Sequence, residues 1–249
     1  MISYIIPTRD RPRRLKDTLL AIEALGDHAT CGGAEVIVAD NDSHERLVLP
    51  RSLRSGVPVR ELRLNQNHGA AARNHAARAS SPDSRWLVML DDDSFPLDLG
   101  FAAALNAAPA DVLAISADIH LSPRDDGTCP RESGGLPEVF IGCGVALRRD
   151  AFLRLGGYDP AFGYYVEEYD LAARLLLQGG RVQFNPAFRV THAKDASNRR
   201  MDLILSRLVR NNGWVAQRYA PEPARLPDIR ETRRRYRAIA AKEHALAGF

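Results

Sequence analysis

The chain has 249 residues, 45% of them hydrophobic, and a formal net charge of +3 at pH 7. This length and hydrophobic content suffice for one large folded domain, and so small a net charge does not by itself indicate a polyanionic partner. The three cysteines lie at unrelated spacings, so we expect neither a disulfide framework nor a zinc site.

The N-terminal segment and the length of the apolar runs indicate where in the cell the protein is expected. The longest apolar runs fall well short of the roughly 18 residues needed to span a bilayer. The chain begins with MISYIIPTRDRP, a strand-like segment that lacks the layout of a signal peptide. We therefore expect a cytoplasmic protein, whose basic end could also contact the inner face of the membrane.

Charge is distributed unevenly along the chain. From Arg199 onward there are 12 Lys/Arg against 5 Asp/Glu, a net +7, which leaves −4 for residues 1–198. We accordingly expect a domain over 1–198 and a basic helical C-terminal extension over 199–249 that packs on it.

The first ninety residues alternate short apolar runs with helix-like segments, which is typical of a parallel sheet with crossover helices. Predicted strands cover 3–7, 35–40, 59–64 and 86–91, and predicted helices cover 11–26 and 69–80. Each of these strands ends in polar residues. Because the carboxyl ends of parallel strands share one edge of the sheet, we expect a ligand site at that edge.

The rest of the first domain is less regular. Residues 121–138 are rich in proline, glycine and charge, and we expect a long loop of the kind that often covers a binding site. A buried strand with two glycines is predicted over 139–152, a helix with a glycine C-cap over 167–180, and a strand over 181–192. The chain from Met201 onward is predicted to be helical.

In WLVMLDDDSFP (86–96), a run of apolar residues leads into three adjacent aspartates. In an extended chain Asp91 and Asp93 point to one side, about 7 Å apart, and Asp92 points to the other. Such oxygen ligands suit Mg²⁺ or Mn²⁺, whose coordination is usually completed by water and a diphosphate. The alternative is a solvated acidic loop in which Asp92 or Asp93 caps the next helix.

Three further groups of polar residues could meet the same edge of the sheet. Asp40 ends the second strand, where it can accept a hydrogen bond from a ligand N–H or form an Asx-turn. Gly69 lies at a predicted helix start with Arg73 one turn on, so backbone amides and a guanidinium could face an anion, unless this is a plain surface helix. His192 closes a strand and is either structural or a metal ligand.

The predicted helix over 167–180 begins with Glu167, Glu168 and Asp170. The helix dipole stabilises acids at this end by ~0.3–1 kcal/mol each, which could explain them on structural grounds alone. Asp170 and Arg174 are spaced for a surface ion pair. A carboxylate near a diphosphate is, however, also what general-base chemistry requires.

Five segments within residues 1–195, taken in order, resemble an inverting glycosyltransferase of the family 2 type. They are SYIIPTRDRP, VADNDS, NHGAAARNHAARAS, WLVMLDDDS, and GGYDPAFGYYVEEYDLAARLLLQGGRVQFNP followed by VTH. Each motif alone is weak, but the five in this order are a strong signature. The resemblance implies the GT-A fold, an α/β architecture with a mostly parallel twisted sheet and flanking helices.

The resemblance also assigns roles to particular residues. Those implied to surround the donor nucleotide, its ribose and its phosphates are Pro7, Thr8, Arg9, Asp40, Arg73, Asn74, Asp91 and Asp92, to which the predicted helix start adds Gly69. Asp40 would pair with the N3–H of a pyrimidine, which suits UDP and dTDP equally. The implied site for Mn²⁺ or Mg²⁺ consists of Asp91, Asp93 and His192.

The catalytic base of such enzymes is usually the second acid of a Glu-Asp pair at the start of the later helix. This chain has Glu167 and Glu168 there, so Glu168 is the positional match with one extra methylene, and the choice between the two stays open. The implied reaction moves a sugar from a nucleotide-diphosphate sugar to a hydroxyl of a glycan, a lipid-linked molecule or a small molecule.

Two other classes of protein fit the sequence less well. A sugar-nucleotide nucleotidyltransferase would carry a glycine-rich loop after the first strand, and IPTRDRP lacks the glycines. The interpretation as a nucleic-acid-binding protein depends on RETRRRYRAIAAK (230–242) alone. This segment has no interleaved aromatic platforms, so no nucleic-acid partner is expected. The basic C-terminal part could instead contact the acceptor, a second copy of the chain or anionic lipid, although packing on the domain is favoured.

Overall fold

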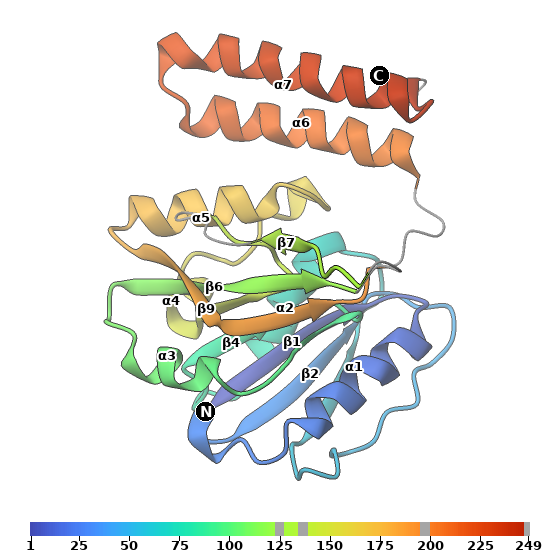
Figure 1. The fold of residues 1–249 in the computed structure, drawn as a ribbon, viewed down its shortest axis with the longest axis vertical. Coiled ribbons are helices and arrows are strands. Elements are labelled where there is room, and N and C mark those ends of the chain that lie inside the picture. Colours follow the sequence, from blue (N-terminus) through green and yellow to red (C-terminus); the bar gives the residue numbers. More distant parts are fainter. Residues whose placement is uncertain (123–126, 134–138, 195–199, 247–249) are drawn as a thin grey trace.

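The computed structural model describes residues 1–122, 127–133, 139–194 and 200–246. Figure 1 shows a twisted sheet with helices on both faces and two long C-terminal helices stacked beyond the helix that begins at Glu167. Within the described ranges, no helix combines the length and the apolar character that crossing a membrane would require.

The described strands form one mixed sheet. They are β1 (Ile2–Thr8), β2 (Ala34–Asp40), β3 (Val59–Arg63), β4 (Trp86–Met89), β5 (Ser94–Pro96), β6 (Val112–Leu121), β7 (Arg131–Ser133), β8 (Val145–Arg148) and β9 (Arg181–His192). Their order is β3-β2-β1-β4-β8-β6-β9-β5, with β7 paired to β6. The first four strands are parallel, β8 is antiparallel to β4 and β6, and β9 runs parallel to β6.

Seven α-helices accompany these strands in the described ranges. They are α1 (Pro12–Ala24), α2 (Ala72–Ala79), α3 (Phe101–Ala107), α4 (Arg149–Arg154), α5 (Glu167–Leu177), α6 (Met201–Tyr219) and α7 (Glu222–Lys242). Single 3₁₀ turns cover Ala29–Cys31, Gly69–Ala71 and Pro160–Phe162.

The core lies on both faces of the sheet because neighbouring side chains of a strand point to opposite sides. On one face, Tyr4 and Ile6 of β1 belong to the cluster that contains Leu15 of α1. On the other face, Ile5 belongs to the cluster that contains Ala72 of α2. All seven residues of β1 are buried, as expected for a central parallel strand covered on both sides.

The predicted α/β fold is confirmed, and the main error concerns residues 139–152. A single buried strand was expected there, but the structure has a turn, in which the Gly144 amide donates to the Ile141 carbonyl, then β8 and then α4. The turn interrupts the apolar run, which hydrophobicity alone cannot reveal. Within 121–138, β7 forms a short strand where a loop was expected, while 123–126 and 134–138 lie outside the described residues.

The two C-terminal helices pack against each other. Their apolar contact centres on Leu205, Ala240 and Ala245. Helix α6 lies next to α5, whereas α7 packs mainly on α6. The helix pair therefore adds a layer over the region where α5 begins.

Candidate active site

A cavity of about 730 Å³ opens at the carboxyl edge of the parallel strands, below α5 and the C-terminal helices. Seven of the residues predicted from the sequence line it: Arg9, Arg73, Asp91, Asp93, Glu167, Glu168 and His192. The other predicted residues are not among those that line it: Pro7, Thr8, Asp40, Gly69, Asn74 and Asp92. The sequence motifs therefore separate into a cavity wall and a supporting layer.

The three aspartates form a turn. Strand β4 ends at Met89, and the Asp91 amide donates to Ser94 Oγ over 2.8 Å. The expected alternation of side chains is therefore wrong at this point: Asp92 and Asp93 are both buried, whereas 37% of the Asp91 side chain is exposed. Asp91 accepts a hydrogen bond from Arg73.

Arg11 supplies a positive charge to this turn that the sequence did not predict. Its Nη1 lies 2.6 Å from Asp92 Oδ1 and its Nη2 lies 2.5 Å from Asp93 Oδ2. Thr8 Oγ1 donates to Asp92 Oδ2 over 2.7 Å. Burial nevertheless raises the pKa of Asp92 to about 7. The pKa of Asp93 is lowered, because hydrogen bonds from His192 and Arg11 outweigh its burial.

His192 joins the acidic turn to β7 and to the turn before β8. Its Nε2 lies 3.3 Å from Asp93 Oδ1, and its Nδ1 lies 2.5 Å from Glu132 Oε2 and 3.5 Å from Cys143 Sγ. Burial lowers the pKa of this imidazole, but the bonds to Asp93, Cys143 and Glu132 together raise it to about 12. The ring therefore favours the protonated form between carboxylates, and a metal ion would have to displace a proton to bind it.

These residues fit a divalent cation. One ligand atom each from Asp91, Cys143 and His192 lie within 4.8 Å of one another, and Asp93 touches the imidazole from the other side. Carboxylate and imidazole are accepted by Mn²⁺, whereas a thiol ligand suits softer metals. Glu132 and Cys143 were missed because they lie in a segment predicted as a loop and in an apolar run predicted as a strand.

Glu167 and Glu168 also line the cavity, from the start of α5. The Gly142 amide donates to Glu168 Oε1 over 3.2 Å, while Glu167 Oε2 is buried without a hydrogen-bond partner among the described residues. Burial raises the pKa of both carboxyl groups and outweighs the opposing charge of Arg73. Both side chains therefore bind a proton more tightly than an ordinary glutamate does.

The supporting layer uses several predicted ligand-binding groups for structural hydrogen bonds. Asp40 is fully buried and accepts from the Ser43 amide at 3.0 Å and from Arg63 Nη1 at 2.9 Å. The side-chain amide of Asn74 bonds the backbone N–H and C=O of Tyr158, at 2.9 and 2.7 Å.

The helix start at Gly69 differs from the expected anion site. The Gly69 amide donates to Asn67 Oδ1, and the Ala70 amide donates to the Gly163 carbonyl at 2.7 Å. A Cβ at position 69 would lie 2.4 Å from that carbonyl oxygen, so the glycine permits a close backbone approach. Both amides therefore donate to groups of the protein itself and not to an anion.

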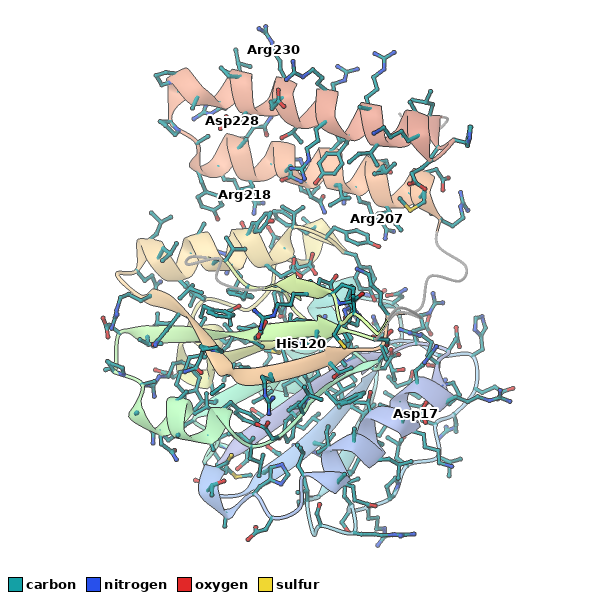
Figure 2. The ribbon with its side chains drawn as sticks, viewed as in Figure 1. Asp17, His120, Arg207, Arg218, Asp228 and Arg230 are labelled. Carbon is teal, nitrogen blue, oxygen red and sulfur yellow. The ribbon has the colours of Figure 1, made fainter. Side chains whose placement is uncertain are left out.

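The expected ion pair between Asp170 and Arg174 is confirmed, with Arg174 Nη2 2.8 Å from Asp170 Oδ2, but its expected position at the surface is wrong. Asp170 is fully buried and accepts from Arg174 Nε at 2.9 Å, from Arg218 Nη1 at 2.6 Å and from Tyr219 Oη at 2.8 Å. Figure 2 shows Arg218 on the side of α6 that faces α5. The C-terminal helices are therefore tied directly to the helix that carries the two glutamates.

Sequence comparisons place the chain among glycosyltransferases. An uncharacterized glycosyltransferase of Haemophilus influenzae is 27% identical over 197 residues, which cover 71% of this chain and 62% of that protein. The rhamnosyltransferase WbbL of Escherichia coli is 34% identical over 73 residues, 28% of each chain. The chain thus spans less than two thirds of the length of these curated relatives.

Solved structures share the fold. A mannosyltransferase of Pyrobaculum calidifontis in complex with GDP-Man and Mn²⁺ superposes with a TM-score of 0.63 and 19% identity, covering 97% of this chain and 75% of that one. S. aureus TarS in complex with UDP-GlcNAc gives a TM-score of 0.63 with 13% identity, covering 95% and 72%. The family model for glycosyl transferase family 2 matches residues 3–155. The chain therefore belongs to glycosyl transferase family 2.

Proposed function

We propose that the protein is a metal-dependent, inverting glycosyltransferase that moves a sugar from a UDP-type or dTDP-type donor to an acceptor hydroxyl. One observation carries this proposal above the others. A single cavity is lined both by an acidic turn that already binds cationic side chains and by two glutamates with raised pKa values. The first suits a leaving diphosphate with its cation, and the second suits removal of a proton.

Arg73 is suited to bind the diphosphate. The guanidinium is buried, and although burial opposes its charge, Asp91 and other nearby groups raise its pKa above the usual value. The side chain lines the cavity, so its guanidinium can donate to a phosphate oxygen. A divalent cation held by Asp93 and His192, with Asp91 and Cys143 beside them, would supply further positive charge to the leaving group.

Glu168 is the group that we assign as the base. It accepts the proton of the acceptor hydroxyl, and that oxygen attacks the anomeric carbon from the face opposite the nucleotide. The bond between this carbon and the diphosphate oxygen breaks, and its electron pair leaves with the diphosphate. A single displacement inverts the configuration. Glu167 is less exposed to solvent than Glu168. We therefore assign Glu167 to the surroundings of the base and not to proton transfer.

Nucleotide binding provides the experiment that tests this function. The unfolding midpoint is measured with UDP, dTDP, GDP and CDP, each with Mn²⁺, Mg²⁺ or excess chelator. A ligand that binds only the native state raises the free energy of unfolding by ~2.7 kcal/mol at a free concentration a hundredfold above Kd, and the midpoint rises with it. We expect a metal-dependent rise with a pyrimidine diphosphate. GDP is included because the Pyrobaculum calidifontis enzyme was solved with GDP-Man, and no rise with any nucleotide would refute the proposal.

A further inference from the structure

The segment that leads into α5 has an unusual backbone. Tyr165 and Val166, directly before Glu167, both adopt left-handed conformations, with φ of 72° and 70°. A β-branched residue such as Val166 rarely takes this conformation, because its Cβ crowds the backbone. Such a conformation persists only where the surroundings hold it, and it is found preferentially at functional sites.

Helix α6 contacts this segment and stabilises its backbone conformation. Asn211 is fully buried, and its Nδ2 lies 3.0 Å from the Phe162 carbonyl oxygen, 3.0 Å from that of Tyr164 and 2.7 Å from that of Tyr165. Arg210 Nη2 donates to the same Phe162 carbonyl over 3.0 Å. Three backbone carbonyls thus converge on one side-chain amide, and an apolar residue at position 211 would leave them without this donor.

The same segment is also fixed on its other side. The Gly163 carbonyl accepts from the Ala70 amide, three residues before Arg73. The segment therefore sets the distance between the arginine on the donor side and the glutamates that follow it. One turn into α5, Arg218 and Tyr219 of α6 bind the buried carboxylate of Asp170, and Arg218 also lies 2.8 Å from Asp159.

We propose that α6 is a working part of the active site and that Asn211 is the positioning residue that holds Glu168 toward the donor. This inference rests on the proposed transferase function. Asn211 does not line the cavity, so it acts through the backbone of 162–166 and not by touching substrate. Displacing a catalytic group by about 1 Å can lower the rate a hundredfold. Hydrogen bonds that fix the backbone of 162–166 can therefore matter for turnover.

The test compares Asn211→Ala with Gln217→Ala, which removes an exposed amide from the same helix. With the donor identified by the nucleotide panel, release of nucleoside diphosphate gives kcat and the donor KM for each variant. We expect kcat of Asn211→Ala to fall about 30- to 100-fold with the donor KM changed less than about threefold. Gln217→Ala should match the parent protein. Hydrogen exchange of the backbone amides in 162–170 should quicken in Asn211→Ala only.

A second variant keeps the inference testable if Asn211→Ala does not fold. Tyr219→Phe removes only the hydroxyl that binds Asp170, and we expect a loss of about two- to fivefold in kcat at constant KM. Folded variants that keep the parent kcat would overturn the role of α6, and so would an equal loss in kcat and in nucleotide-induced stabilisation. Failure of the transferase proposal itself would be seen separately, as the absence of metal-dependent nucleotide binding in the parent protein.

Discussion

Two acidic clusters line the same cavity, and the pKa of Asp93 in one is shifted in the opposite direction from those of the two glutamates in the other. Asp93 of the aspartate turn lies within reach of Arg11 and protonated His192, and its pKa is lowered. For Glu167 and Glu168, burial outweighs the charge of Arg73, and their pKa values are raised. Asp93 thus stays ionised and can exchange one cation for another, while the glutamates take up a proton more readily than ordinary carboxyl groups.

This difference also explains how three adjacent aspartates are tolerated. Arg11 bridges Asp92 and Asp93, and Arg73 contacts Asp91. The chain therefore supplies its own counter-charges at the place where a metal and a diphosphate are proposed to bind. Among the residues that the structure describes, no cationic side chain bridges the two glutamates, and burial is the largest influence on their pKa values.

Removing the base should have the largest effect. Glu168→Gln keeps the size of the side chain and its contact with the Gly142 amide region but cannot accept the acceptor proton. We expect kcat to fall by about 10²–10⁴, the usual contribution of general-base catalysis. The measurement is the steady-state rate of nucleotide release. Glu167→Gln serves as the comparison, and a larger loss there than in Glu168→Gln would reverse the assignment of the base.

Removing the cation-binding acid should have the next largest effect. Asp93→Asn eliminates a carboxylate that contacts both His192 and Arg11, so both metal binding and donor binding should weaken. We expect kcat/KM to fall about 10²–10³-fold, similar to the loss of one group that stabilises charge in a transition state. Excess chelator should reduce the parent protein to a comparable rate. If this variant kept a metal-dependent response to nucleotide, the aspartate turn would not be the metal site.

The raised pKa of Glu168 should appear in the pH dependence of kcat. Because burial raises this pKa, the base becomes protonated at a higher pH than an ordinary glutamate, whose pKa is about 4.3. Activity should therefore decline on the acid side at a pH clearly above that value, by tenfold per pH unit. The rate is measured from pH 4.5 to 8 at saturating donor. An acid-side decline that begins no higher than expected for an ordinary glutamate would contradict the assignment of Glu168 as the base.

The smallest effects, on stability, should have opposite signs in the two clusters. A carboxyl whose pKa is raised by folding contributes stability below its unfolded pKa and loses it as pH rises through the folded value, so Glu167 weakens the fold at pH 7. The lowered pKa of Asp93 contributes stability above its unfolded pKa, which is lost as pH falls.

We therefore expect Glu167→Gln to raise the Tm at pH 7 and Asp93→Asn to lower it, by ~2–4 °C for each kcal/mol of change. The gain for Glu167→Gln should disappear near pH 4, where the parent side chain is protonated in both states. Thermal unfolding followed at pH 7 and pH 4 measures both differences. Shifts of the same sign at pH 7 would contradict the distinction between the clusters.

Most of the fold was predictable because its signals are local. Strands such as Ile2–Thr8 and Ala34–Asp40 are short apolar runs bounded by polar residues, and sheet topology then brings their ends together. The prediction failed over 139–152, because a turn inside an apolar run leaves its hydrophobicity unchanged.

The supporting contacts of the site were not predictable, because they join residues far apart in the chain. Arg11 reaches Asp92 across 81 positions, and Asn211 reaches Phe162 across 49. Neither residue has a local pattern that distinguishes it from other surface arginines or helix asparagines. Motif reasoning found the cavity-lining glutamates, but the groups that position them depend on tertiary packing.

The most direct test of the central claim measures nucleotide binding and turnover side by side in Glu168→Gln and Asp93→Asn. The two clusters have different tasks in this account, so the two variants should fail differently. We expect Glu168→Gln to keep the metal-dependent rise in Tm with nucleoside diphosphate while losing turnover, and Asp93→Asn to lose both. If Glu168→Gln lost nucleotide binding as well, or kept its turnover, the assignment of one cluster to the cation and the other to the proton would be wrong.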